Sequence, residues 1–244
     1  NSKLNIMPAD DSKYAGLPTS RYGTAAYQRI SLAHYLPQTI NKVIYIDSDI
    51  VVIDDIKALW DISLEGRPLA AAENLSPKAY KHLNFSRNEY FNSGVLVIDL
   101  EQWRKNDTHQ QTIEIVKNNY KIIRYFDQCS LNMIFRGCWT KLPLNWNQQS
   151  DIYGVLKKYS DGCGYSTVEI KQAILQPSIV HFMGRHKPWL LNCYHPFKTT
   201  YQHYLDKTPW RGAKPKDYSL LNSIFYSLKI KKILIKILSI KEIQ

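Results

Sequence analysis

Short, almost wholly apolar runs recur along the chain and predict its strands. The runs at 42–47, 91–100 and 178–183 are rich in β-branched side chains, and a weaker run lies at 68–73. Runs of this length, in which nearly every residue is apolar, are typical of strands that are buried on both faces of a sheet. We therefore expect these segments to form a largely parallel sheet.

Segments with helical spacing of apolar residues lie between these runs. They predict helices at 22–36, 54–60, 108–118 and 126–135. The polar stretches 1–20 and 145–164, which are interrupted by glycine or proline, are expected to be loops. Strands that alternate with helices predict the α/β class, in which ligands bind beyond the carboxyl ends of strands.

Composition limits the class of protein further. The chain has 244 residues and a mass of 28.4 kDa, enough for one large domain or two small ones. Apolar residues make up 44% and charged residues 22%, which argues against intrinsic disorder. The four cysteines are scattered and form no C-x-x-C pair, so we expect neither a disulfide scaffold nor a zinc ribbon, and a reduced, cytoplasmic setting fits best. We expect neither a membrane span nor a signal peptide.

Basic charge is concentrated at the C-terminal end. Residues 211–244 carry eight basic and two acidic side chains, which gives +6 of the net +11 of the chain. Lysines alternate there with leucine and isoleucine, so we expect a helical, basic tail (211–244) that docks on an anionic membrane surface, beside a folded domain formed by residues 1–210. The alternative is a tail that packs partly on the domain. Basic residues are not clustered elsewhere, so nucleic acid is not an expected partner.

Asp47-Ser48-Asp49 is the first candidate for chemistry, because it directly follows the apolar residues 43–46. Two carboxylates one residue apart at the end of a strand can bind one hard cation such as Mg²⁺ or Mn²⁺. The simpler alternative is an acidic pair in a solvated loop. The same residues also match the nucleophile motif of haloacid-dehalogenase-type phosphatases, in which Asp47 would attack phosphorus. The chain has no convincing copy of the downstream acidic motif that those phosphatases require.

His181, Gly184 and Lys187 are the second candidate and follow the run at 178–180. A neutral imidazole can bind a metal ion, a glycine lets the backbone approach a phosphate closely, and a lysine offers a point charge to a phosphate oxygen. A lone histidine at a strand end is more often structural. The three residues together, in a chain with a separate acidic pair, indicate a site for a metal ion and a phosphate group.

Several further blocks carry a resemblance to a known family. They are Tyr27-Gln-Arg29, Val43-Ile-Tyr-Ile-Asp-Ser-Asp49, Tyr90-Phe-Asn-Ser-Gly-Val-Leu-Val-Ile-Asp-Leu100, Asp127-Gln128, Leu144-Asn145-Trp-Asn147 and His181-Phe-Met-Gly-Arg-His-Lys-Pro-Trp189. With these blocks in this order, over about residues 20–210, the chain resembles the retaining glycosyltransferases of family 8. The resemblance implies a Rossmann-like fold of the GT-A type with a mixed, mostly parallel sheet.

The resemblance also implies a role for each matching residue. By the family pattern, Asp47, Asp49 and His181 bind Mn²⁺, with Mg²⁺ as the other candidate. Gly184 and Lys187 would contact the diphosphate of a UDP-sugar. The donor sugar would be bound, and its reaction assisted, by four residues: Arg29, Asn92, Asp127 and Gln128, of which Asp127 and Gln128 are the catalytic candidates. Judged from the residues alone, an arginine on a helix such as Arg29 is more often a surface residue, and Asp127 could simply be a helix N-cap.

The resemblance implies transfer of galactose or glucose, with retention of configuration, to a saccharide acceptor of a surface lipooligosaccharide or lipopolysaccharide. The enzyme would then lie on the inner face of a bacterial inner membrane. Attack by the acceptor on the front face of the sugar is expected, because the amide of Gln128 is a poor nucleophile.

The chain departs from the family pattern in two places. An opening strand with an Asp/Asn-Tyr motif is not found before Tyr22, so the first strands of the fold are expected to be missing, and Glu73-Asn74 replaces the usual acidic position near the acceptor. Two alternatives therefore stay open: a truncated, inactive transferase that binds membrane, and a phosphatase that uses Asp47.

Overall fold

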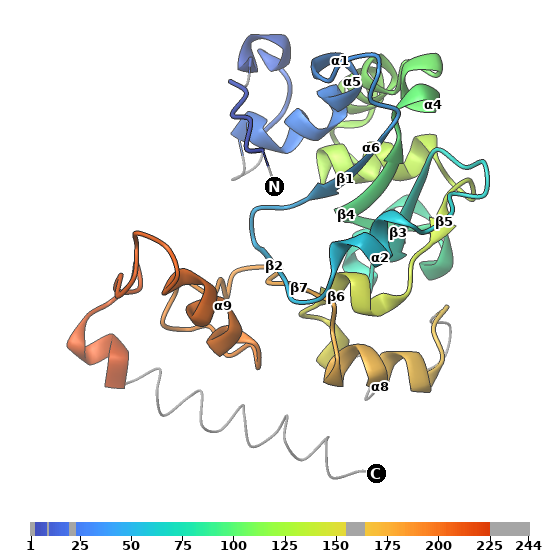
Figure 1. Cartoon of the computed structure of the whole chain (residues 1–244). Coiled ribbons are helices and arrows are strands. Elements are labelled where there is room, and N and C mark those ends of the chain that lie inside the picture. The colour runs from blue at the N-terminus through green and yellow to red at the C-terminus, as the bar shows by residue number, and fades with distance from the viewer. Residues whose placement is uncertain (1–2, 9, 20–22, 155–163, 225–244) are drawn as a thin grey trace. The chain divides into compact units, whose positions relative to one another are not determined.

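The computed structural model describes residues 3–8, 10–19, 23–154 and 164–224 (Figure 1). Contacts divide the chain into two compact units. Unit 1 consists of Asn1–Tyr45 and Ala58–Leu142, and unit 2 consists of Ile46–Lys57 and Pro143–Gln244. Each unit is therefore assembled from two separate stretches of the sequence.

The sheet of unit 1 has the strand order β1-β4-β3-β5. These strands are β1 (Lys42–Ile46), β3 (Leu69–Glu73), β4 (Phe91–Asp99) and β5 (Thr140–Lys141). β3 and β4 run antiparallel with a bulge between Ala71 and Glu73, whereas β3 and β5 run parallel. All of β3 and all but the last residue of β4 are buried, which explains why their sequences are nearly continuous apolar runs.

The helices of unit 1 pack with the sheet around one hydrophobic core, in which Tyr27, Tyr90, Phe91 and Trp103 are among the largest buried side chains. The helices described are η1 (Asp11–Tyr14), η2 (Gly23–Ser31), α1 (Leu32–Tyr35), α3 (Pro77–Tyr80), η3 (Lys81–Leu83), η4 (Arg87–Glu89), α4 (Leu100–Lys105), α5 (Thr108–Asn119) and α6 (Phe126–Ile134). Aspartates at the N-caps of α4 and α5 accept backbone N–H groups that would otherwise lack partners.

Asn132 fixes α6 to the start of β4. Its side-chain oxygen accepts the N–H of Phe91 at 2.7 Å, and its amide nitrogen donates to the carbonyl oxygen of Phe91 at 3.0 Å. The same amide nitrogen donates to the carbonyl oxygen of Gln128 at 2.8 Å. Because all of these groups are buried, the hydrogen bonds hold the later part of α6 against the start of β4.

Unit 2 contains a smaller sheet with the strand order β2-β7-β6. These strands are β2 (Ile50–Val52), β6 (Gln148–Gln149) and β7 (Ile179–His181). β2 and β7 run antiparallel with Ile50 opposite His181, and β6 and β7 run parallel with Gln149 opposite His181. His181 therefore lies at the end of the central strand, with a neighbour on each side.

Helices complete unit 2. They include η5 (Leu144–Asn147), α8 (Thr167–Leu175) and α9 (Lys198–Leu205). The helix α2 (Ile56–Trp60) follows β2 along the chain, and its residues from Ala58 on belong to unit 1. α8 begins at a capping box in which Ser166 and Glu169 accept each other's backbone N–H groups. Val180, Phe182 and Cys193 form one cluster of buried apolar side chains in this unit.

The predicted α/β class with a mixed sheet is confirmed. The apolar runs predicted a largely parallel sheet, but more of the strand pairs are antiparallel than expected. The composition of a strand that is buried on both faces does not depend on whether its neighbours run parallel or antiparallel to it. The expected helix at 22–36 is mainly a 3₁₀ helix, η2, followed by the short α1. The prediction of a loop at 145–164 is wrong for its first residues, which form part of η5 and all of β6, and β2, α8 and α9 were not predicted.

Only the start of the predicted basic tail is described. Residues 225–244 lie outside the described residues, and the division of the chain at residue 210 stays a prediction. The first residues of the tail are hydrogen-bonded to the domain: the N–H of Lys216 donates to the carbonyl oxygen of Trp189, and Oδ1 of Asp217 accepts the N–H of Leu191. Farther along, Leu220, Leu221 and Ile224 are 72%, 81% and 55% exposed. Among the described residues, no helix is long and apolar enough to cross a membrane.

Candidate functional site

The acidic pair and the histidine of the sequence motifs come together in unit 2. Asp47 and Asp49 lie in the turn before β2, and the carbonyl oxygen of Asp49 accepts the N–H of Phe182 at 3.0 Å. This bond and the antiparallel register fix Asp49 beside His181. Nε2 of His181 is 3.3 Å from Oδ1 of Asp49 and 3.8 Å from Oδ2 of Asp47. One ligand atom from each residue lies within 4.8 Å of the other two.

The chemistry of these three side chains fits a divalent cation. Nδ1 of His181 donates a hydrogen bond to Oδ1 of Asn147 at 3.0 Å, so the lone pair of the neutral ring is on Nε2, the nitrogen that faces the carboxylates. Two carboxylate oxygens and a bare imidazole nitrogen repel one another unless positive charge lies between them. Mn²⁺ and Mg²⁺ accept such a partial set of protein ligands and complete their coordination with water or phosphate oxygens.

Lys187 places a positive charge at this centre. Its Nζ donates to Oδ2 of Asp49 and, at 2.8 Å, to the carbonyl oxygen of Phe182. Burial by itself raises the pKa of the Asp49 carboxyl, but its polar neighbours, among them the positively charged Lys187, outweigh burial and hold that pKa well below its usual range. The Asp49 carboxylate is therefore ionised and available as a metal ligand across the physiological pH range.

Gly184 makes the turn between His181 and Lys187 possible. Its φ is +81°, a left-handed conformation that side chains other than glycine rarely adopt. A Cβ atom added at Gly184 would meet no heavy atom within 4 Å, so the space beside its backbone is open. That opening is what a phosphate group needs in order to approach the backbone closely.

A second polar cluster lies in unit 1 and contains the other predicted site residues. Nε of Arg29, on η2, is 2.8 Å from Oδ2 of Asp127, on α6, and both side chains are only 9% exposed. Nη1 of Arg29 donates to the backbone carbonyl and, at 2.8 Å, to the hydroxyl of Ser93 on β4. The Arg29 guanidinium also lies 4.5 Å from the centroid of the Tyr45 ring. Arg29 is therefore a buried, fully engaged residue rather than a surface one.

Gln128 belongs to the same cluster, and its side-chain amide is held at both ends. Its Oε1 accepts the N–H of Ser93 at 3.0 Å, and the hydroxyl of Ser93 and the amide of Asn92, each at 3.3 Å. Its Nε2 donates to the hydroxyl of Tyr90 at 3.3 Å. With its carbonyl oxygen already accepting three hydrogen bonds, Gln128 is better suited to orient a substrate than to attack one.

The structure thus groups the predicted site residues into two clusters. Asp47, Asp49, His181, Gly184 and Lys187 form the metal-side cluster in unit 2, and a second set forms the sugar-side cluster in unit 1. The members of that second set are Arg29, Asn92, Asp127 and Gln128. Sequence reasoning missed three supporting residues: Asn147, Ser93 and Tyr90. Each lay inside a quoted sequence block, but their roles depend on contacts with distant parts of the chain.

The fold and these clusters define a class of protein, namely an α/β domain with an acidic pair and a histidine able to bind a divalent cation. Comparison with known proteins identifies the family. The model of glycosyltransferase family 8 matches residues 3–193, and the chain belongs to this family. The family match decides between the two enzymatic interpretations of Asp47-Ser48-Asp49 in favour of the transferase and against the phosphatase.

Individual relatives agree with this assignment. General stress protein A of Bacillus subtilis is 33% identical over 213 residues, which cover 85% of this chain and 74% of that protein. Lipopolysaccharide 1,2-glucosyltransferase of Escherichia coli is 26% identical over 222 residues, or 88% of this chain and 64% of that protein. The chain thus spans less than two thirds of the length of the Escherichia coli protein.

Among solved structures, the galactosyltransferase LgtC, crystallised with donor and acceptor sugar analogues, is similar to this chain. Its TM-score is 0.71 at 25% identity, and the match covers 84% of this chain and 77% of LgtC. This likeness supports the Rossmann-like fold of the GT-A type that the sequence predicted.

Proposed function

We propose that this chain transfers a hexose, galactose or glucose, from a UDP-sugar to a saccharide acceptor of a surface lipooligosaccharide or lipopolysaccharide, and that it retains the configuration of the sugar. The observation that carries this proposal is the convergence of Asp47, Asp49 and His181 on one small volume in a chain of this family. The chain is similar to a lipopolysaccharide glucosyltransferase and to a galactosyltransferase, which supports the choice of hexose and acceptor.

The metal-side cluster would bind the diphosphate of the donor. Asp47, Asp49 and His181 would hold Mn²⁺ or Mg²⁺, and a bound cation of this kind supplies positive charge that stabilises a departing diphosphate. Lys187 adds a second positive charge, and its hydrogen bond to the carbonyl oxygen of Phe182 aims it toward the same carboxylates. Gly184 leaves its backbone accessible to a phosphate oxygen.

The sugar-side cluster would bind and orient the hexose. The carboxylate of Asp127 can accept hydrogen bonds from sugar hydroxyls, and its ion pair with Arg29 fixes its position. Gln128 and Asn92 add amide groups whose positions are set by Ser93. Arg29 acts through Asp127 and Ser93 and is a positioning residue in this scheme.

Retention then follows from attack on the same face as the leaving group. The bond between the anomeric carbon and the diphosphate oxygen breaks, and the acceptor hydroxyl forms the new bond to that carbon from the same face. The proton of the hydroxyl passes to the departing diphosphate, so no protein nucleophile is needed. The side-chain carbonyl oxygen of Gln128 already accepts hydrogen bonds from Ser93, so it is poorly placed to attack the sugar, in agreement with this scheme.

Replacement of Asp49 tests the assignment. We expect Asp49→Ala to abolish metal-dependent turnover of UDP-galactose and UDP-glucose while circular dichroism shows a folded protein. The matched control is Asp151→Ala, which removes an exposed carboxylate from the same unit and is expected to leave turnover unchanged. Wild-type-like turnover by Asp49→Ala would defeat the site assignment, as would full activity of the wild type in the presence of excess EDTA.

We further propose that the basic tail (211–244) attaches the enzyme to the inner face of a bacterial inner membrane. The net charge of the tail and its exposed apolar side chains, with Leu220 72% and Leu221 81% exposed, support this proposal. Co-sedimentation with vesicles tests it: binding is expected with anionic phosphatidylglycerol and not with neutral phosphatidylcholine. Vesicle binding together with a complete absence of UDP-sugar affinity would instead favour an inactive transferase remnant.

A further inference from the structure

The segment Asn145-Trp146-Asn147 runs along β7 and is hydrogen-bonded to it at both ends. At the start of the strand, Asn145 accepts the N–H of Ser178 on its carbonyl oxygen at 2.9 Å and donates its side-chain amide to the Ser178 hydroxyl at 2.8 Å. At the end of the strand, Oδ1 of Asn147 accepts the Nδ1–H of His181 at 3.0 Å. One short turn thus holds the strand that carries the histidine of the metal-side cluster.

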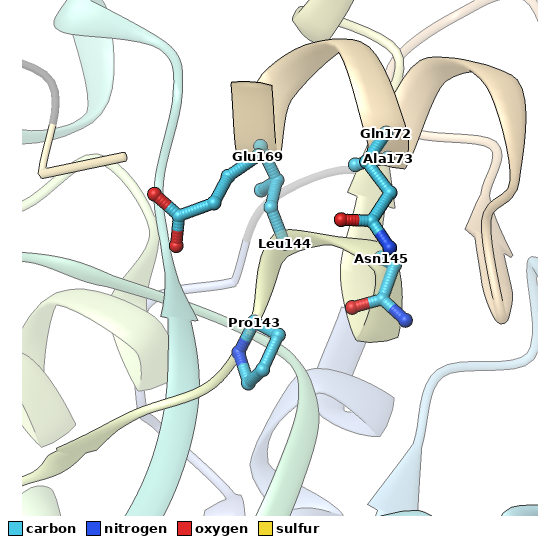
Figure 2. Close-up of a pocket in the computed structure, with 6 residues that line it drawn as sticks. All are labelled: Pro143, Leu144, Asn145, Glu169, Gln172 and Ala173. Atoms are coloured by element: carbon cyan, nitrogen blue, oxygen red, sulfur yellow. The ribbon is translucent and has the colours of Figure 1, made fainter. Parts of the chain in front are cut away.

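This turn is itself anchored to α8. Pro143, Leu144 and Asn145 face Glu169, Gln172 and Ala173 of α8 across a small pocket (Figure 2). Directly after Asn147, the side chain of Gln148 is buried and donates to the carbonyl oxygen of Ala173 at 2.9 Å. The parallel pairing of β6 with β7 continues from there. Asn147 is therefore supported on both sides along the chain and has little freedom to move.

Burial increases the energetic importance of the hydrogen bond between Asn147 and His181. Asn147 is 0% exposed and His181 is 3% exposed, so water cannot readily replace either partner. A neutral imidazole carries one proton, and only the nitrogen without that proton can bind a metal ion. If nothing accepted a hydrogen bond from Nδ1, the proton could lie on Nε2 and block the nitrogen that faces Asp47 and Asp49.

We infer that Asn147 is a positioning residue of the metal-side cluster: its side-chain oxygen holds the proton of His181 on Nδ1 and fixes the ring so that Nε2 binds the cation. This inference rests on the proposed metal-binding function of Asp47, Asp49 and His181. Partners of this kind behind a metal-binding histidine typically change metal affinity by about 10–100-fold when they are removed. The sequence alone does not point to this role, because two asparagines separated by one residue are not a recognised metal-binding motif.

Metal binding in the absence of nucleotide tests the inference apart from catalysis. The measurement is the free Mn²⁺ signal in electron paramagnetic resonance during titration of the full chain. Asn147→Leu keeps the approximate volume but removes the acceptor, and we expect its Mn²⁺ affinity to fall by about 10–100-fold. Asn147→Asp keeps an acceptor for Nδ1–H, and we expect its affinity to remain within about threefold of the wild type or to exceed it.

Asn145→Leu is the matched control, because it removes the side-chain hydrogen bond at the other end of β7 and leaves His181 untouched. Its Mn²⁺ affinity is expected to equal that of the wild type. Equal loss of affinity in Asn145→Leu and Asn147→Leu would overturn the inference, because it would show that only the placement of the strand matters. Unchanged affinity in a folded Asn147→Leu would overturn it as well, and the metal centre would stand.

A measurement on the unmutated protein keeps the inference testable if Asn147→Leu does not fold. Long-range ¹H–¹⁵N correlation spectra of the metal-free chain, recorded at a pH that keeps the ring neutral, report which ring nitrogen of His181 carries the proton. We expect the proton on Nδ1. A proton found on Nε2 would refute the role of Asn147, whereas a wild-type chain that binds no Mn²⁺ at all would refute the metal centre itself and the inference with it.

Discussion

Arg29 and Asp127 form a buried ion pair that ties the N-terminal helix η2 to α6, with Nε of Arg29 2.8 Å from Oδ2 of Asp127. The two residues are 98 positions apart in sequence, and each side chain is only 9% exposed. Arg29 also donates to Ser93 on β4, so one guanidinium connects two helices and a strand of unit 1. The pair is therefore a structural element of the unit as well as part of the proposed sugar site.

Removal of one partner of this pair is expected to destabilise the protein strongly. In Arg29→Met the Asp127 carboxylate stays buried without its counter-ion, and the free energy of unfolding should fall by about 3–5 kcal/mol. The exposed pair between Arg136 and Glu89 is the control, since Arg136→Met should cost at most about 1 kcal/mol. Urea unfolding followed by circular dichroism measures both changes. An equal loss of unfolding free energy in the two variants would mean that burial does not increase the contribution of the Arg29–Asp127 pair to stability.

His195 gives unit 2 a stability that depends on pH. Its ring is 7% exposed and lies 4.8 Å from the ring of Phe182, measured between centroids. Nδ1 of His195 accepts the N–H of Phe197, and Nε2 has no partner among the described residues. Burial, followed by the nearby His181, lowers the pKa of His195 to about 4. The folded protein therefore keeps this ring neutral at a pH where an unfolded chain would protonate it.

The sign of the pH effect follows from this difference. Between pH values of about 4 and about 6.5 the unfolded state binds more protons at this site than the folded state, so stability falls as pH falls. From about pH 7 to about pH 5, wild type should lose about 2 kcal/mol more stability than His195→Phe, which cannot titrate there. Denaturant unfolding at a series of pH values checks this. Parallel stability curves for the two proteins would contradict the lowered pKa.

Substitution of Gly184 can separate the effect of backbone strain on stability from an effect on ligand binding. Gly184→Ala places a side chain at a φ of +81°, and the strain should cost about 1–2 kcal/mol of stability. Gly212, with a φ of +75° in the same unit, is the matched control and should show a similar loss as Gly212→Ala. Only Gly184→Ala is expected to weaken UDP binding, since its new methyl group enters the space proposed for the diphosphate. Calorimetric titration with UDP in the presence of Mn²⁺ distinguishes the two variants, and equal UDP affinities would remove Gly184 from the site.

The elements that could be predicted from the sequence are those with a strong local signal. The apolar runs became β1, β3, β4 and β7, and the helical patterns at 108–118 and 126–135 became α5 and α6. β2 escaped prediction because it has only three residues, and residues 23–31 form a 3₁₀ helix that apolar spacing does not distinguish from an α-helix. Strand direction also could not be read from composition, because it depends on how the chain returns to the sheet.

The same division holds for the site. Asp47, Asp49, His181 and Lys187 stand next to predicted strand ends, which marked them as candidates for a site. Their approach to one another depends on β2, which pairs with β7 and was not predicted. Asn147 could not be found in this way, since its contact with His181 depends on the pairing of a two-residue strand, β6, with β7. Residues that orient other residues carry ordinary polar side chains, and only the folded structure shows what they face.

Ser93 offers the sharpest test of positioning in the sugar-side cluster. Its hydroxyl accepts from Arg29 at 2.8 Å and donates to Oε1 of Gln128 at 3.3 Å, so it connects the ion pair to the catalytic candidate. In Ser93→Ala the backbone N–H of residue 93 still holds Gln128, and we expect a loss of about 1–2 kcal/mol in stability with a fall in kcat that exceeds the rise in KM. Ser130→Ala is the control: this serine is equally buried, but its hydroxyl bonds the carbonyl oxygen of Phe126 within α6. A similar loss of stability with unchanged kcat is expected for Ser130→Ala. If both variants keep the kcat of the wild type, the hydroxyl of Ser93 has only a structural role and the alignment of Gln128 depends on the backbone alone.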